Sequence, residues 1–140
     1  MIAALTVSPR RHWVRLIFAL LPNENVDTVK LLPFVRQLRR QIGSPLILVW
    51  DRLNVHRAVD TRIRRRCRSI HFEFLPPYAP ELNPVEMLWA WLKMNPLAND
   101  PAYEVQVLCE RAHLHTHRAS CDQALLRSFI RATPLSSCLR

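Results

Sequence analysis

Two acidic side chains have the surroundings that metal chemistry requires. Asp51 ends the apolar run Pro45–Trp50, which is typical of a buried strand that presents an acid at its C-terminal tip. In an α/β sheet, ligands bind at that edge. Glu86 follows Asn83 by three residues, at the start of a predicted helix. Carboxylate oxygens bind hard divalent ions, and Mg²⁺ is suited to bridging protein acids and phosphate.

Each acid also has a purely structural interpretation. Asn83 has the short acceptor side chain of an N-cap, and Pro84 fits the first helical position. Glu86 could therefore be a capping-box residue that reaches back to the Asn83 amide, and Asp51 could cap the helix that follows it. A first-turn Glu also feels the positive end of the helix dipole, which favours its ionised form. Capping and metal binding thus remain competing uses of both carboxylates.

The neighbouring segments indicate how the chain would position these acids. Three prolines within residues 76–80 disfavour both helix and ladder pairing, so we expect residues 75–82 to form a stiff extended connection. Residues 69–75 alternate apolar and polar side chains, as a half-buried edge strand does. After Asp51, apolar side chains at every fourth position mark a helix over residues 55–63.

The first 43 residues predict two strands and a helix. Residues 2–7 and 13–21 are β-prone and are joined by a polar turn, which favours an antiparallel hairpin. Residues 31–42 carry apolar side chains at the spacing of an amphipathic helix, with arginines on its outer face. Pro33 either kinks or begins that helix. Gly43, the single glycine of the chain, stands where a left-handed residue would end it.

The composition points to a polyanionic partner. The 140 residues include 20 Lys and Arg against 11 Asp and Glu, which gives a net charge of +9 and an isoelectric point near 10.7. Nucleic acid is the first candidate for such a partner, and a merely basic surface is the alternative.

The sequence gives no indication of export or membrane insertion. The four cysteines show no C-x-x-C pairing and no charged region precedes the apolar start, so we expect reduced thiols and no secretion. The longest apolar run, residues 16–21, is far short of the ~20 residues that a membrane span requires. We therefore expect a cytoplasmic, nucleoid-associated protein with no membrane partner.

The motifs around both acids resemble one family. Asp51 is followed by Asn54 and His56, and residues 75–86 read Leu-Pro-Pro-Tyr-Ala-Pro-Glu-Leu-Asn-Pro-Val-Glu. Between the two acids lie 34 residues. This pattern and spacing resemble the catalytic core of mariner-type DDE transposases, in their bacterial insertion-sequence branch. The resemblance covers residues 1–130, most of the chain.

The resemblance implies both a fold and an activity. The fold would be α/β: RNase H-like, with three layers, a mixed sheet and a helical C-terminal layer. Asp51 and Glu86 would be the second and third metal-binding, catalytic carboxylates, with Mg²⁺ as cofactor and Mn²⁺ as its substitute. The activity would be metal-dependent cleavage and transfer of DNA strands at transposon ends, during insertion-sequence transposition. Asn54, His56 and Asn83 would lie at the edge of the active site.

Basic residues near the acids would serve the DNA. Arginines are densest in and after the helix that follows Asp51, where they could offset repulsion between the acids and a phosphate backbone. A solvated helix face is the alternative interpretation. The candidate DNA-binding residues are Arg57, Arg62, Arg64, Arg65, Arg66 and Lys93.

The first acid of the resembled triad is not in this sequence. The acids before Asp51 are Glu24 and Asp27, and both lie in the polar segment that opens a helix. We therefore expect a domain truncated at its N-terminus, which lacks its first, central strand. The expected divisions are one partial catalytic domain over residues 1–140, a core over residues 1–95 and C-terminal helices over residues 101–133.

Such a chain would be inactive alone. Its candidate partners, besides DNA, are an upstream-encoded transposase segment, a full-length transposase, and further copies of itself when the domain is complete. The alternative function is that of a non-catalytic DNA-binding remnant, or a regulator of a full-length transposase.

A rival metal site is spaced along the C-terminal part. Four soft ligands recur at every fourth position: Cys109, His113, His117 and Cys121. On one continuous helix they would form a stripe suitable for Zn²⁺, as in a zinc-supported interaction module. Ser120 with Gln123, however, is a capping-box signature that predicts a helix break before Cys121. A linear stripe is also poorly suited to surrounding one tetrahedral ion.

Overall fold

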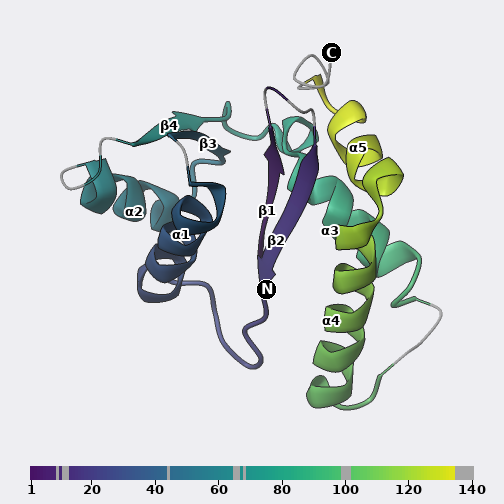
Figure 1. Ribbon diagram of the computed structural model, residues 1–140. Helices are drawn as coiled ribbons and strands as arrows, with labels where there is room; N and C mark the ends of the chain where they lie inside the picture. Colours follow the sequence, from purple (N-terminus) through teal and green to yellow (C-terminus); the bar gives the residue numbers. More distant parts are fainter. Residues whose placement is uncertain are drawn as a thin grey trace. The chain divides into compact units, whose positions relative to one another are not determined.

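The chain forms two compact units (Figure 1). The computed structural model describes residues 1–8, 10, 13–43, 45–64, 67, 69–98 and 102–134. We call Met1–Glu24 together with Glu81–Arg140 the hairpin unit, and Asn25–Pro80 the parallel unit. A short 3-10 turn, Pro80–Leu82, spans the boundary between them.

The hairpin unit begins with two antiparallel strands. β1 (Ile2–Val7) pairs with β2 (Val14–Ala19), in a register that sets Ile2 opposite Ala19 and Val7 opposite Val14. The predicted hairpin is therefore confirmed. Of its turn, Pro9, Arg11 and His12 lie outside the described residues.

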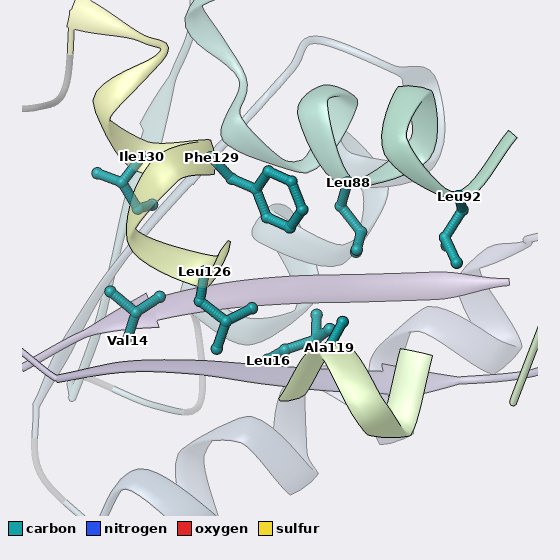
Figure 2. Packing of buried hydrophobic residues seen from close by; sticks show 8 residues of the cluster. All are labelled: Val14, Leu16, Leu88, Leu92, Ala119, Leu126, Phe129 and Ile130. Carbon is teal, nitrogen blue, oxygen red and sulfur yellow. The ribbon is translucent and has the colours of Figure 1, made fainter. Parts of the chain in front are cut away.

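Three helices complete the hairpin unit, α3 (Pro84–Met94), α4 (Val105–Cys121) and α5 (Gln123–Arg131). All three pack against the hairpin or one another around one apolar cluster (Figure 2). Leu88 and Leu92 of α3 point toward the strands, and Leu88 is fully buried. The cluster consists of Val14, Leu16, Leu88, Leu92, Ala119, Leu126, Phe129 and Ile130.

A side chain also fastens α5 to the hairpin. Gln123 Nε2 donates to the Val14 carbonyl oxygen (2.7 Å), and the Val14 N–H donates to Gln123 Oε1 (3.2 Å). The amide of Gln123 thus pairs with β2 as a neighbouring peptide group would. Because backbone groups left unpaired in a core are costly, this contact stabilises the end of the strand.

The expected helix break before Cys121 is wrong. α4 continues through Cys121, and Asp122 rather than Ser120 caps α5, because its carboxylate accepts from the Leu125 N–H (2.9 Å). Ser120 Oγ instead donates to the His117 carbonyl oxygen (2.6 Å). A Ser hydroxyl can bond backward within a helix, so it need not mark a helix start.

The parallel unit contains α1 (Thr28–Ile42), β3 (Leu46–Trp50), α2 (Asn54–Arg64) and β4 (Ile70–Phe74). β3 and β4 run parallel, with Leu46 opposite Ile70 and Trp50 opposite Phe74. Along β4, exposure alternates as the sequence predicts, with Ile70 and Phe72 buried. Two helices therefore accompany one short parallel strand pair.

The ends of α1 follow the sequence pattern. The Asp27 carboxylate accepts from the Lys30 N–H (2.9 Å) and caps the helix. Gly43 has φ 70° and donates its N–H to the Arg39 carbonyl oxygen, so a left-handed glycine ends α1 as predicted. Pro33 lies inside the helix and neither begins nor ends it.

The connection before α3 is not extended throughout, in contrast to the prediction. Pro77 and Tyr78 form a turn, and Tyr78 has φ 58°. Proline fixes its own φ and biases the residue before it toward extended conformations. Tyr78 precedes Ala79 rather than a proline, so it is free to turn.

The strands form two small sheets instead of one mixed sheet. Within the described residues, β1 pairs with β2 and β3 with β4, and no ladder connects the two pairs. The chain is thus a mixed α/β protein with two-stranded sheets and helices. In the part of the chain that the structure covers, no helix combines the length and apolar character needed to cross a membrane.

Candidate active site

Asp51 directly follows β3, at the C-terminal end of the parallel strand pair. Its Oδ1 accepts from the Leu53 N–H (3.1 Å) and lies 2.6 Å from His56 Nδ1. Both contacts that the described residues make with this carboxylate fall on Oδ1. The side chain is 41% exposed, and within the described residues no hydrogen bond occupies Oδ2. Asp51 therefore combines a local capping contact with an available carboxylate oxygen.

His56 is held from two directions. Its ring stacks on the Trp50 ring, with centroids 4.5 Å apart and planes inclined by 5°, while Nδ1 faces the Asp51 carboxylate. Trp50 in turn stacks on Phe72 (5.2 Å). The imidazole donates Nδ1–H to Asp51 and so fixes the orientation of that carboxylate. Its other nitrogen, Nε2, is then an acceptor.

The same edge is fastened across the two strands. The Leu75 N–H donates to the Trp50 carbonyl oxygen (2.9 Å), and Arg52 Nε donates to the Leu75 carbonyl oxygen (3.2 Å). Asn54 is the first residue of α2 and is exposed. Within the described residues, His56 and not Asn54 contacts the Asp51 side chain.

Glu86 lies in the first turn of α3, in the hairpin unit. Asn83 caps this helix, because its Oδ1 accepts from the Val85 N–H (3.2 Å). The Glu86 N–H donates to the Asn83 carbonyl oxygen (3.0 Å), and the described residues provide no hydrogen bond to the Glu86 carboxylate. The reach back to the Asn83 amide that a capping box requires is therefore not formed.

The position of Glu86 is set by the core. Two residues further along α3, Leu88 is fully buried, and Leu92 is buried one turn beyond. Lys93 lies seven residues after Glu86, so the two share a helix face. Asp51 belongs to the parallel unit and Glu86 to the hairpin unit, and their sharing of one metal ion stays a prediction.

The candidate DNA-binding arginines differ in their contacts. Arg57 and Arg62 on α2 are exposed. Arg64 forms an ion pair with Asp60, donates to the Phe72 carbonyl oxygen (3.2 Å) and lies over the Phe72 ring. Arg65 and Arg66 lie outside the described residues.

The donors suit a hard ion better than zinc. Asp51 supplies a half-exposed carboxylate at a strand end, and carboxylate oxygen is the ligand that Mg²⁺ prefers. The soft stripe lies on one helix, but no three His, Cys, Asp or Glu side chains in the described ranges come together as a metal cluster. Cys67, Cys109 and Cys121 are free thiols.

Sequence reasoning missed the aromatic support of Asp51. Trp50 appears in the sequence only as the last apolar residue of a strand. The signal that could have identified it is its place directly before the acid and six residues before a histidine. β3 ends at Trp50 and α2 begins at Asn54, and the turn between them brings His56 against both Trp50 and Asp51.

Comparison with known proteins gives one family. The family model described as DDE superfamily endonuclease matches residues 5–109, which include Asp51, Glu86 and the strands and helices that carry them. No curated protein and no solved structure matches the chain. Since the match spans well over half of the 140 residues, the chain belongs to the DDE superfamily endonucleases.

Proposed function

We propose that this chain is a catalytic-domain part of a mariner-type transposase of the insertion-sequence branch, which cleaves and transfers DNA strands with divalent metal ions. The observation that carries the proposal is the part-exposed Asp51 carboxylate at the end of β3, whose Oδ1 is held by His56. It lies inside the region that matches the endonuclease family.

Asp51 and Glu86 are the proposed metal ligands. Bound Mg²⁺, or Mn²⁺ in its place, would activate the attacking oxygen and stabilise the leaving one during phosphodiester cleavage. His56 is a positioning residue, because it donates to Oδ1 and so orients the carboxylate. Asn54 and Asn83, at the starts of α2 and α3, are proposed to line the same site.

Charge supports DNA as the substrate. The net charge of +9 favours a polyanion, and the exposed Arg57 and Arg62 follow Asp51 on α2. Lys93 shares a helix face with Glu86, so it is proposed to contact the phosphate backbone near that acid. Arg64 is the weaker candidate, since Asp60 already pairs with its charge.

The complete fold is proposed to be RNase H-like. In that fold one mixed sheet would have a further strand at its centre. Its terminal acid would complete the catalytic triad. Neither earlier acid can replace it, because Asp27 caps α1 and Glu24 lies in the connection before that helix. These 140 residues by themselves are therefore proposed to be inactive until a segment that carries the third acid is supplied.

This shortage of acids also favours a second candidate function. A chain that keeps the basic surface but has only Asp51 and Glu86 of the three acids could bind DNA, or a full-length transposase, without cutting DNA. The distinguishing property is metal-dependent nicking after the third acid is supplied, which a catalytic part would show and a regulator would not.

Thermal unfolding with and without metal tests the proposed site. About 10 mM Mg²⁺ or Mn²⁺ should raise Tm by mass action, and Asp51→Asn should abolish the rise. The matched control is Asp27→Asn, which removes the same charge while Asn caps a helix as well as Asp does. An equal metal response in both variants would show that Asp51 is not a ligand.

A further inference from the structure

A broad groove lies between α1 and α2, within the parallel unit. Its volume is about 820 Å³, and the buried side chains of Ile63 and Ile70 form part of its lining. Four arginines also line it: Arg36, Arg39 and Arg40 from α1, and Arg62 from α2. No acidic side chain lines this groove within the described residues.

The groove is separate from the candidate active site. It adjoins the last turn of α1 and Ile70, the first residue of β4, whereas Asp51 follows the last residue of β3. Because Leu46 lies opposite Ile70, the groove is at the N-terminal end of the strand pair. The five residues of β3 separate the two ends by ~16 Å, at ~3.3 Å for each residue.

The positive charge of the groove is largely uncompensated. Arg36, Arg40 and Arg62 are exposed, and within the described ranges none of them forms an ion pair with an acid. Arg39 Nε donates to Ser69 Oγ (2.7 Å), a neutral partner that leaves its charge in place. Residues 36 and 40 are one helical turn apart, so their side chains emerge on the same side of α1.

A thiol, that of Cys67, also lines the groove. Its Sγ lies 3.1 Å from Ser69 Oγ. Hydrogen bonding from Ser69, and to a smaller extent the Arg39 charge, lower the pKa of the Cys67 thiol below its ordinary value. The local environment therefore stabilises a negative group.

Stabilisation of helix ends is the simpler explanation for some of these arginines. Arg39 and Arg40 lie in the last turn of α1, and Arg62 lies in the last turn of α2, where a cation meets the negative end of the helix dipole. Arg36 lies more than one turn before that end, and its charge falls outside the range of this effect. The helix dipole therefore accounts for three of the four arginines and leaves Arg36 unexplained.

The volume and the lining of the groove indicate which class of ligand it would bind. Small-molecule pockets of comparable volume are mostly apolar, with few polar groups. Here guanidinium groups from two helices surround a short apolar floor, and guanidinium forks match phosphate oxygens. Arg36 and Arg40 are ~6 Å apart along the helix axis, so they can contact successive phosphates of one strand.

We propose that the groove between α1 and α2 binds the phosphodiester backbone of duplex DNA, away from the Asp51 edge. The inference rests on the proposed function in one respect, that the polyanion is duplex DNA. It does not depend on metal binding by Asp51. A duplex held at both ends of the strand pair would be fixed in orientation relative to the reacting phosphate.

DNA affinity measured in EDTA tests the groove. Duplex binding by fluorescence anisotropy should weaken steeply between ~50 and ~200 mM salt, with a slope of about −0.9 for each phosphate contact. The Arg36→Gln/Arg40→Gln variant should lose about two units of that slope and bind uniformly more weakly across sequences. The matched control, Arg118→Gln/Arg131→Gln, replaces two exposed arginines of the hairpin unit. Equal losses in both variants would overturn the proposal.

Alkylation of Cys67 gives a second, positional readout. Saturating duplex should slow alkylation of Cys67, followed by mass spectrometry, while Cys121 on α4 should react at an unchanged rate. An unchanged Cys67 rate with bound DNA would overturn the groove assignment, as would stronger binding of duplex RNA. These DNA-binding assays contain no metal. Their results therefore do not depend on whether Asp51 binds a metal ion, and a negative result in them says nothing about the metal test.

Discussion

The two units of the chain are built on different forces. The hairpin unit packs strands and three helices around one cluster of eight buried residues, and its sequence holds nine Lys and Arg against seven Asp and Glu. The parallel unit holds eleven Lys and Arg against four Asp and Glu. Seven of the nine net positive charges therefore belong to the unit that carries Asp51.

The two units also hold their candidate acids in different ways. Glu86 lies on a helix that two buried leucines fix against the hairpin, so apolar packing determines its position. Asp51 is instead held by hydrogen bonds and by the stacked Trp50 and His56 rings. Substitutions in the hairpin unit should therefore act mainly through stability, and those in the parallel unit mainly through charge and ligand binding.

The largest expected effect concerns catalysis by these 140 residues alone. The purified chain should not nick supercoiled plasmid with Mn²⁺, because Asp51 and Glu86 would lack the third acid of the clamp. A strand ending in Asp, fused ahead of Met1 or added as a separate chain, should produce nicking. Metal-dependent nicking by the purified wild-type chain that is lost in Glu86→Gln would contradict this prediction.

A smaller effect tests whether the apolar cluster stabilises the hairpin unit. Leu88→Ala should lower the free energy of unfolding by about 2–5 kcal/mol, because it removes a fully buried side chain and leaves a cavity. The matched control is Ile47→Ala on β3, where the side chain is 69% exposed, and its cost should stay within about 0.5 kcal/mol. Urea unfolding curves measure both values. Similar losses in the two variants would mean that the cluster in Figure 2 does not dominate stability.

Local patterns in the sequence predict the elements of both units well. Alternation identifies β4, spacing identifies α2, and the lone Gly43 marks the end of α1. The break at Ser120 was wrong because Asp122 offers a competing cap two residues later. Ser120 and Asp122 are both suitable capping residues, and the pattern of residue types alone does not decide which of them caps α5.

Contacts between distant residues were beyond sequence reasoning. The pairing of strands into two separate sheets depends on which ladders form, and each strand's composition is compatible with either arrangement. The groove between α1 and α2 is lined by residues of two helices that β3 separates in the sequence, so its four arginines are spread over 27 positions, from Arg36 to Arg62. The pair of His56 and Asp51 is closer in sequence, but its geometry depends on the stack with Trp50.

The smallest expected effect concerns the charge environment at the rim of the groove. Since the thiolate is the reactive form, the alkylation rate of Cys67 rises as pH rises through its pKa. A lowered pKa moves that rise to lower pH, so Ser69→Ala, which removes the main cause, should move the midpoint of the rate profile upward. Arg39→Gln should move it upward by less, because the Arg39 charge is a smaller cause.

Cys121 in the same samples provides the internal control for this measurement. It is exposed on α4 and remote in sequence from Ser69, so its rate profile should be the same in wild type and both variants. Identical Cys67 midpoints in wild type and Ser69→Ala would mean that the hydrogen bond at 3.1 Å does not stabilise the thiolate. An upward shift confined to Cys67 would show that the parallel unit stabilises negative charge locally, at the rim where the duplex backbone is proposed to bind.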